Sequence, residues 1–282
     1  MALSKQNTVS IIVPTLNRAD LLLRCLQSIS KDLSASSYKA EIIIVDGGCD
    51  KETLEVVTSF SNIVSTHIRE KDSGVSDAVN KGLTYATSEW IRFLGDDDEL
   101  VEGAMDHALQ YCFLNHEIDV CIGHAQLFRQ QGESIIPFEV KQPIGEILFH
   151  DMFDLGNCED GGIGWPSPEV AISRRDLFVK HGGYCLKYHY LAYWEMWLRQ
   201  LILGVKFHAI PCVMARRYLT ERSDTLLGSK SAISKERFRL QWAYGGFSWL
   251  YNSSCKSSSG AIDTLRSLIR TTRLVIRAHT SS

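Results

Sequence analysis

The chain has 282 residues, enough for one large domain or two small ones with a proper hydrophobic core. Its 30 Lys and Arg nearly balance its 33 Asp and Glu, and the net charge of -3 gives no global positive field, so we expect no nucleic-acid partner. No run of about 18 apolar residues and no signal-peptide pattern is present, so we expect a cytoplasmic chain.

The first half alternates apolar strand-like runs with amphipathic helical segments. We expect strands at 9–13, 41–45, 63–68, 90–94 and 118–122, and helices at 19–30, around Leu54 to Phe60, at 75–86 and at 102–114. This alternation predicts a parallel sheet with right-handed crossovers. In such sheets ligands gather at the carboxyl ends of the strands.

After Gly132 the pattern is less regular. We expect a substrate-contacting or mobile loop at 154–165, a capping box at Ser173 to Asp176 that opens a helix to Lys180, a helix at 191–203, a strand at 205–214 and a polar segment at 216–230. We therefore predict one catalytic domain over 1–230, divided at 105/106 into nucleotide-binding and acceptor-binding halves, and a helical extension over 231–282.

The 8 cysteines are scattered without a C-x-x-C pair, so neither a zinc knuckle nor a disulfide framework is indicated. We expect most of them to be reduced and buried.

The run Trp90 to Leu94 ends in three consecutive carboxylates, Asp96, Asp97 and Asp98. Neighbouring acids repel one another, and stability alone gives no reason to place them at a strand end. A bound Mg²⁺ or Mn²⁺ would reverse the sign, because carboxylate oxygens suit both ions. The alternative is an acidic loop that caps the helix after Glu102.

Other carboxylates also follow predicted strands. Asp46 precedes Gly47-Gly48 and could accept hydrogen bonds from a nucleobase or ribose, or could simply belong to an Asp-Gly turn. Asp72 and Asp77 could be ordinary helix-start carboxylates. We expect Thr15, Asp46, Asp72 and the acidic triplet to meet at one edge of the sheet.

Four segments in this order resemble the signatures of glycosyltransferase family 2. They are Ser10-Ile-Ile-Val-Pro-Thr-Leu-Asn-Arg18, Glu41-Ile-Ile-Ile-Val-Asp46-Gly, Asp72-Ser-Gly-Val-Ser-Asp77-Ala-Val-Asn80-Lys81-Gly82 and Phe93-Leu-Gly-Asp-Asp-Asp98. The resemblance covers about the first 100 residues well and continues loosely to about residue 220.

The resemblance implies an α/β protein of GT-A fold, with a Rossmann-like, mostly parallel central sheet flanked by helices. It also implies an inverting glycosyltransferase that moves a sugar from a nucleotide-sugar donor, commonly a UDP-sugar, to a glycan or lipid-linked acceptor in polysaccharide biosynthesis. The implied cofactor is Mn²⁺ or Mg²⁺, held by Asp98 and Asp96. The implied nucleotide-binding residues are Pro14, Thr15, Asn17, Asp46, Asp72, Asp77, Asn80, Lys81, Asp96 and Asp97.

Inversion requires a base for the acceptor hydroxyl. The family's usual Asp falls on Tyr193, and tyrosine with a pKa of about 10 is a poor base at neutral pH. We therefore predict Glu195 as the catalytic base, with an i,i+4 ion pair to Arg199 as the alternative. Pro168-Glu169 falls where relatives have a His-containing motif, and the role of Glu169 is left open.

Two further segments carry clustered cations. Arg216 and Arg217 suit a lid over the diphosphate or a solvated basic turn. The stretch 261–279 places four arginines on one stripe of a predicted helix, which could associate peripherally with the inner face of the membrane or pack on the domain.

Two other functions remain open from the sequence. The chain could be a nucleotide-sugar-binding subunit without catalysis, because Tyr193 replaces the usual acid. A sugar nucleotidyltransferase would need a glycine-rich loop after the first strand, and Thr15 to Arg18 contains no glycine. The sequence names neither the donor sugar, the acceptor, the linkage nor the oligomeric state.

Overall fold

The computed structural model describes residues 8–131, 134–140, 144–149, 152, 166–219 and 230–252. The first half contains, in order, β1 (Thr8–Thr15), α1 (Ala19–Ala35), β2 (Lys39–Asp46), α2 (Lys51–Ser59), β3 (Val64–Arg69), α3 (Val75–Tyr85), β4 (Trp90–Phe93), β5 (Asp98–Leu100) and α4 (Ala104–Leu114). The second half contains β6 (Val120–Gln131), β7 (Ser134–Val140), β8 (Gly145–Ile147), η3 (Pro168–Val170), β9 (Ala171–Arg174), α6 (Arg175–His181), α7 (Ala192–Ile202), β10 (Phe207–Leu219) and α9 (Lys230–Asn252).

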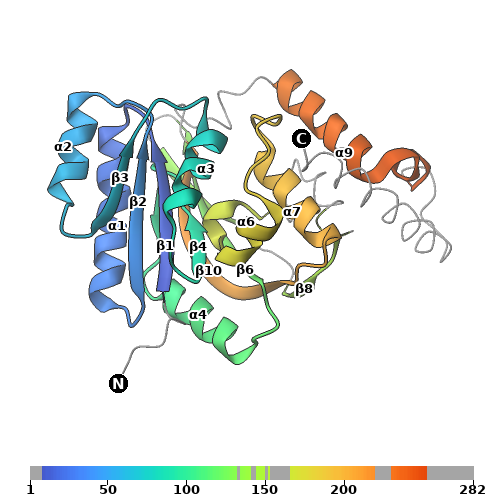
Figure 1. The fold of residues 1–282 in the computed structure, drawn as a ribbon, viewed down its shortest axis with the longest axis horizontal. Helices are drawn as coiled ribbons and strands as arrows, with labels where there is room; N and C mark the ends of the chain where they lie inside the picture. The colour runs from blue at the N-terminus through green and yellow to red at the C-terminus, as the bar shows by residue number, and fades with distance from the viewer. Residues whose placement is uncertain are drawn as a thin grey trace.

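One mixed sheet organises these elements (Figure 1). Its strand order is β3-β2-β1-β4-β9-β6-β10-β5, with β7 paired to β6 and β8 paired to β10. The strands β3, β2, β1 and β4 are mutually parallel, as the alternating pattern predicts. The second half is mixed, because β9 is antiparallel to β4 and β6 while β6 and β10 are parallel. The α/β class and the GT-A-type arrangement of the first half are confirmed.

The core lies along the central strands, which have apolar side chains on both faces. Val9, Ile11 to Val13 and Ile42 to Val45 are fully buried. Burial on both faces explains why these strands are continuous β-branched runs without polar alternation. Gly82 lets α3 approach β1 closely, because a Cβ there would lie 2.5 Å from Ile12 Cγ2.

Two sequence predictions about the second half are wrong. Arg174, not Ser173, is the N-cap of α6, and it makes no side-chain capping bond; Ser173 belongs to β9 instead. Residues 216–219 are not a polar turn but continue β10, where Arg216 and Arg217 pair with the acids of β5.

Other predictions fall on residues that the structure does not describe. These are the loop at 154–165, positions 220–229 and the basic stretch at 261–279. Of the predicted extension over 231–282, the described part is helical in α9. The division into domains stays a prediction. None of the helices in the described ranges is both long and apolar enough to cross a bilayer.

Candidate active site

The ends of β1, β2 and β4 bring three of the predicted polar groups together. Thr15 and Asp46 are register partners in adjacent parallel strands. The Thr15 hydroxyl donates a hydrogen bond to Asp96 Oδ2 at 2.8 Å. The side chains of Thr15, Asp46 and Asp96 are almost completely buried at the carboxyl ends of the strands, so they do not belong to a solvated loop.

The acidic triplet is held by cations on three different elements. Arg18 Nη1 lies 3.3 Å from Asp96 Oδ1 and 3.8 Å from Asp97 Oδ2. Arg24 donates to the carbonyl oxygen of Asp97 at 2.7 Å. On β10, Arg217 Nε lies 3.7 Å from Asp98 Oδ2. The triplet therefore faces the interior of the strand edge and is not a helix cap.

Burial makes the charged form of these acids unfavourable. It raises the pKa of Asp96 to about 6, although Arg18 and Thr15 oppose the rise. Burial also raises the pKa of Asp98 well above its usual range, against the opposing effect of Arg217. A site that collects buried carboxylates with too little positive charge is suited to a cation.

The donor set fits a divalent ion that completes its coordination with substrate. Within the described residues, no three His, Cys, Asp or Glu side chains gather into a complete metal site. Mg²⁺ is commonly held by one or two carboxylates together with substrate phosphates and water. Gly95 also allows the carboxylates to crowd, since a Cβ there would lie 2.8 Å from Asp97 Oδ1 and 3.1 Å from Asp98 Oδ2. Asp98 and Asp96 remain the predicted ligands.

Asp46 belongs to the Asp-Gly turn that was one of its two expected roles, and it also lies close to His67 and Arg69 on β3. Its Oδ1 accepts hydrogen bonds from the backbone N–H of Gly48 at 2.8 Å and of Cys49 at 2.5 Å. Its Oδ2 lies 3.2 Å from His67 Nε2 and 3.6 Å from Arg69 Nε. Burial raises the pKa of Asp46, but these hydrogen bonds outweigh burial and leave the pKa lowered. Asp46 is therefore anionic at neutral pH.

Asp72 approaches the same turn from the loop before α3. A Cβ on Gly47 would lie 2.6 Å from Asp72 Oδ2, so glycine lets the Asp72 carboxylate approach without shifting. Asp72 Oδ1 also accepts a hydrogen bond from Gly74 N at 2.9 Å. The structure thus brings Asp72 to the end of β2, as the sequence predicts.

The loop after β1 is tied to the loop after β2. Asn17 has a positive φ of 54° and accepts a hydrogen bond from Asp50 N at 2.7 Å. Pro14 lies beside Val45 in the β1–β2 register. These contacts fix the shape of the edge around Thr15 and Asp46.

Three predicted donor-site residues on α3 have structural partners. Asp77 accepts a hydrogen bond from Ser73 N at 2.9 Å and Lys81 Nζ lies 3.0 Å from Glu70. Asn80 makes two hydrogen bonds to the backbone of Tyr184, at 2.9 and 2.8 Å. A nucleotide-binding role for these residues stays a prediction.

Facing the triplet is a pair of residues from the second half, Glu169 on η3 and Arg217 on β10. Arg217 Nε lies 3.6 Å from Glu169 Oε2 and 3.7 Å from Asp98 Oδ2. Burial lowers the pKa of Arg217, but Glu169 and Asp98 outweigh it and leave that pKa raised. From the sequence, Glu169 falls where relatives have a His-containing motif, and its role was left open. The structure places Glu169 across from the triplet.

Arg92, which was not among the predicted site residues, holds Glu169 and β10 together. The side chain is fully buried in β4 and donates to the carbonyl oxygens of Glu169 at 2.6 Å and Met214 at 2.8 Å. An arginine in the middle of the apolar run Trp90 to Leu94 was the available signal, because a buried charge needs partners.

Glu195 forms the i,i+4 ion pair with Arg199 that was the expected alternative to a catalytic role. Arg199 Nε and Nη2 contact its two oxygens at 2.9 and 3.1 Å, and the Tyr244 hydroxyl donates to Oε1 at 2.6 Å. Tyr193 is also unsuited to the role, since burial raises its pKa to about 12 and the phenol therefore stays protonated at neutral pH. Glu195 as the base stays a prediction, and its engaged oxygens argue against it.

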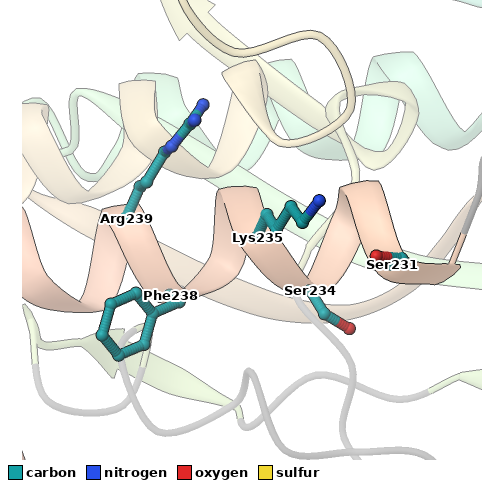
Figure 2. Close-up of a pocket in the computed structure, with 5 residues that line it drawn as sticks. All are labelled: Ser231, Ser234, Lys235, Phe238 and Arg239. Carbon is teal, nitrogen blue, oxygen red and sulfur yellow. The ribbon is translucent and has the colours of Figure 1, made fainter.

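A separate shallow hollow lies on α9 (Figure 2). It has a volume of about 340 Å³ and is lined by Ser231, Ser234, Lys235, Phe238 and Arg239. Figure 2 shows Lys235 and Arg239 projecting on one side of the helix and Phe238 on the other. None of the predicted site residues lines it, so the chemistry points to the strand edge rather than to this hollow.

Comparison with known proteins agrees with this geometry. The chain matches the sequence model of "Glycosyl transferase family 2" over residues 10–178. It is 31% identical over 198 residues to a PGL/p-HBAD biosynthesis glycosyltransferase of Mycobacterium bovis, a match that covers 67% of this chain and 68% of that protein. It is also 31% identical over 176 residues to a glycosyltransferase of Haemophilus influenzae, covering 62% of this chain and 55% of that protein.

Solved structures show the same fold. The crystal structure of S. aureus TarS 1-349 in complex with UDP-GlcNAc superposes with a TM-score of 0.63 at 16% identity. That match covers 83% of this chain but 64% of the TarS chain, so this chain spans less than two thirds of that structure. The family model, the mycobacterial relative and the strand edge together show that the chain belongs to glycosyl transferase family 2.

Proposed function

We propose that the chain is an inverting glycosyltransferase that moves a sugar from a UDP-sugar to a hydroxyl of a glycan or lipid-linked glycan. The observation that carries this proposal is the convergence of Thr15, Asp46 and the acidic triplet at the carboxyl ends of β1, β2 and β4. TarS, which shares the fold, was crystallised in complex with UDP-GlcNAc, and this supports a nucleotide-sugar donor. The mycobacterial relative, a PGL/p-HBAD biosynthesis glycosyltransferase, supports glycosyl transfer in a biosynthetic pathway.

The nucleotide would lie over the ends of β1 and β2. Asp46 is anionic and buried there, and it suits N–H groups of a base or a ribose hydroxyl. Asp72 and the backbone of Gly47 would form the neighbouring wall, since Asp72 reaches the turn that follows Asp46. His67 and Arg69 on the neighbouring strand β3 lie beside Asp46 Oδ2 and would hold the carboxylate in position.

The diphosphate would lie at the acidic triplet, where Asp98 and Asp96 would hold Mn²⁺ or Mg²⁺. When bound, such an ion acts as a Lewis acid that neutralises the departing diphosphate. Arg217 would add a fixed positive charge beside Asp98. Arg18 would keep Asp96 and Asp97 in place while the donor binds.

UDP binding and UDP release test the proposal together. We expect UDP with Mn²⁺ to raise the melting temperature, because a ligand at 100 times its Kd adds about 2.7 kcal/mol to the free energy of unfolding. A screen of UDP-sugars should then identify a donor from which UDP is released in a metal-dependent reaction.

Asp98→Asn is the matching variant. It should lower metal-dependent transfer by about 10²-fold or more, as the loss of a transition-state charge partner does. Asp176→Asn on α6 is the control, because Asp176 is exposed and its ion pair with Lys180 includes none of the proposed site residues. Full metal-dependent activity of Asp98→Asn would refute the metal assignment. Tight UDP binding without turnover for every donor would favour the binding-subunit alternative.

A further inference from the structure

An inverting transfer needs a group that accepts the proton of the attacking hydroxyl, and the two positions that the family pattern suggests are poorly suited to it. Both oxygens of Glu195 are occupied by Arg199, and Tyr244 donates to one of them. Glu195 is also 5% exposed, and the contact with Tyr244 turns it toward α9. Both oxygens of this carboxylate are thus already engaged by Arg199 and Tyr244, and the geometry gives an acceptor hydroxyl no free place beside them.

Glu169 has the properties that Glu195 lacks. Its Oε2 is buried and accepts no hydrogen bond from any group in the described part of the chain. The nearest cation, Arg217 Nε, stays 3.6 Å away, outside hydrogen-bonding distance. An oxygen of this kind has a lone pair free for a hydroxyl that enters from the substrate side.

The backbone around Glu169 holds this oxygen in a fixed place. Pro168 opens the η3 turn, which closes with a hydrogen bond from Val170 N to Ser167 O at 3.2 Å. Arg92 binds the Glu169 carbonyl oxygen at 2.6 Å and joins it to Met214 on β10. A catalytic group held in this way needs little reorganisation during the reaction.

The surroundings of Glu169 connect it with the donor end of the site. Arg217 lies between Glu169 and Asp98, at 3.6 and 3.7 Å, so the two carboxylates face one another across a shared cation. Glu169 also acts electrostatically on Asp97, Asp98 and Tyr193. Glu169 therefore lies near both the acidic triplet and Tyr193, which occupies the family's usual base position.

We propose that Glu169 is the catalytic base. It would take the role of the Asp that the family usually has at position 193, where this chain has a tyrosine. This inference rests on the proposed glycosyl transfer. The acceptor O–H gives its proton to Glu169, and its oxygen forms a bond to the anomeric carbon of the donor sugar. The bond from that carbon to the diphosphate oxygen breaks, and its electron pair leaves with UDP. Glu195 then has a structural role: it pairs with Arg199 within α7 and joins α7 to Tyr244 on α9.

The experiment compares Glu169→Gln with Glu195→Gln, using the donor found by the UDP-release screen. Glu169→Gln should lower kcat for transfer by about 10²- to 10⁴-fold, the usual contribution of a general base. Its Kd for UDP with Mn²⁺, measured by calorimetry, should stay within about threefold of wild type. Glu195→Gln should keep kcat within about threefold and instead lower the melting temperature, because it weakens a buried ion pair.

A nucleophile without a proton separates a base from a structural residue. Azide attacks the anomeric carbon without losing a proton, so Glu169→Ala should recover UDP release and form a glycosyl azide when azide is added. Asp98→Asn should not recover, because its loss affects the leaving group.

The outcomes distinguish the two proposals. Two results would overturn the role of Glu169 alone. One is a transfer rate of Glu169→Gln equal to that of the wild type, and the other is a loss of Mn²⁺ binding in Glu169→Gln equal to that in Asp98→Asn. A wild-type protein that releases no UDP from any donor would overturn glycosyl transfer and the base with it.

Discussion

Two carboxylates at the strand edge differ in how the fold treats their charge. Asp46 accepts two backbone N–H bonds, so its pKa is lowered despite its burial. Asp96 has fewer compensating donors, and burial raises its pKa to about 6. Asp46 is thus already stabilised as an anion, whereas Asp96 gains most from a cation that arrives with the substrate.

The lowered pKa of Asp46 predicts a pH-dependent contribution to stability. A depressed folded-state pKa contributes stability above the unfolded pKa of about 3.9, and that contribution is lost as pH falls through the folded value. Asp46→Asn should therefore lower the free energy of unfolding by about 1–3 kcal/mol at pH 7 and by less near pH 3.5.

Urea unfolding at both pH values measures this difference. Asp176→Asn, at an exposed position, is the control and should cost less than about 0.5 kcal/mol. An equal cost of Asp46→Asn at both pH values would mean that its charge does not contribute.

At the scale of elements, α9 stabilises the start of α7. Glu236 on α9 accepts hydrogen bonds from the backbone N–H groups of His189, Tyr190 and Leu191, at 2.7, 2.9 and 3.0 Å. A carboxylate beside these otherwise unpaired donors satisfies them and complements the helix dipole. Figure 1 shows α9 next to α7 and at the far end of the molecule from α2.

Removing this contact should destabilise the protein locally. Glu236→Ala should lower the free energy of unfolding by about 1–3 kcal/mol, because three N–H groups lose a charged acceptor. Lys235→Ala, its exposed neighbour on α9, should change stability by less than about 0.5 kcal/mol. Thermal unfolding followed by circular dichroism measures both, and equal effects would show that Glu236 is not the anchor.

Elements with strong local patterns were predictable, and short ones were not. The runs Ile11 to Val13 and Ile42 to Val45 are continuous and apolar, which is typical of strands buried on both faces. The strands β5, β8 and β9 have three or four residues and no periodicity of their own. They form because longer partners offer unpaired backbone groups, which is information outside the segment.

At the scale of the whole molecule, the sheet predicts an order of protection. β1 lies between β2 and β4, and its central residues are fully buried. β3 is at the sheet edge, and its side chains are mostly exposed or half-buried. Amides of β1 should exchange with solvent only on global unfolding, and those of β3 earlier through local opening. Hydrogen exchange followed by mass spectrometry measures the order, and equally slow exchange of β3 would contradict it.

The site was predictable to the extent that it follows from topology. Parallel strands end at one edge, so the meeting of Thr15, Asp46 and the triplet could be inferred from strand order alone. The opposite wall could not, because Arg92, Glu169 and Arg217 come together through pairings of β4, η3 and β10 that span long stretches of sequence. His67 was missed because its partner Asp46 lies on a neighbouring strand.

The antiparallel pairing of β5 with β10 has a consequence for how the protein is assayed. It sets Arg217 opposite Asp98 and Arg216 opposite Glu99, so each of the two cations on β10 faces one acid on β5. A slip of one residue would turn every side chain of the pair to the other face of the sheet. Such a molecule could keep its core and its circular dichroism spectrum while lacking the cation beside the triplet. Titration of active sites with a tight-binding nucleotide would therefore count the molecules in which β5 and β10 are correctly paired. Molecules in which this pair has slipped would appear as a shortfall against the total protein.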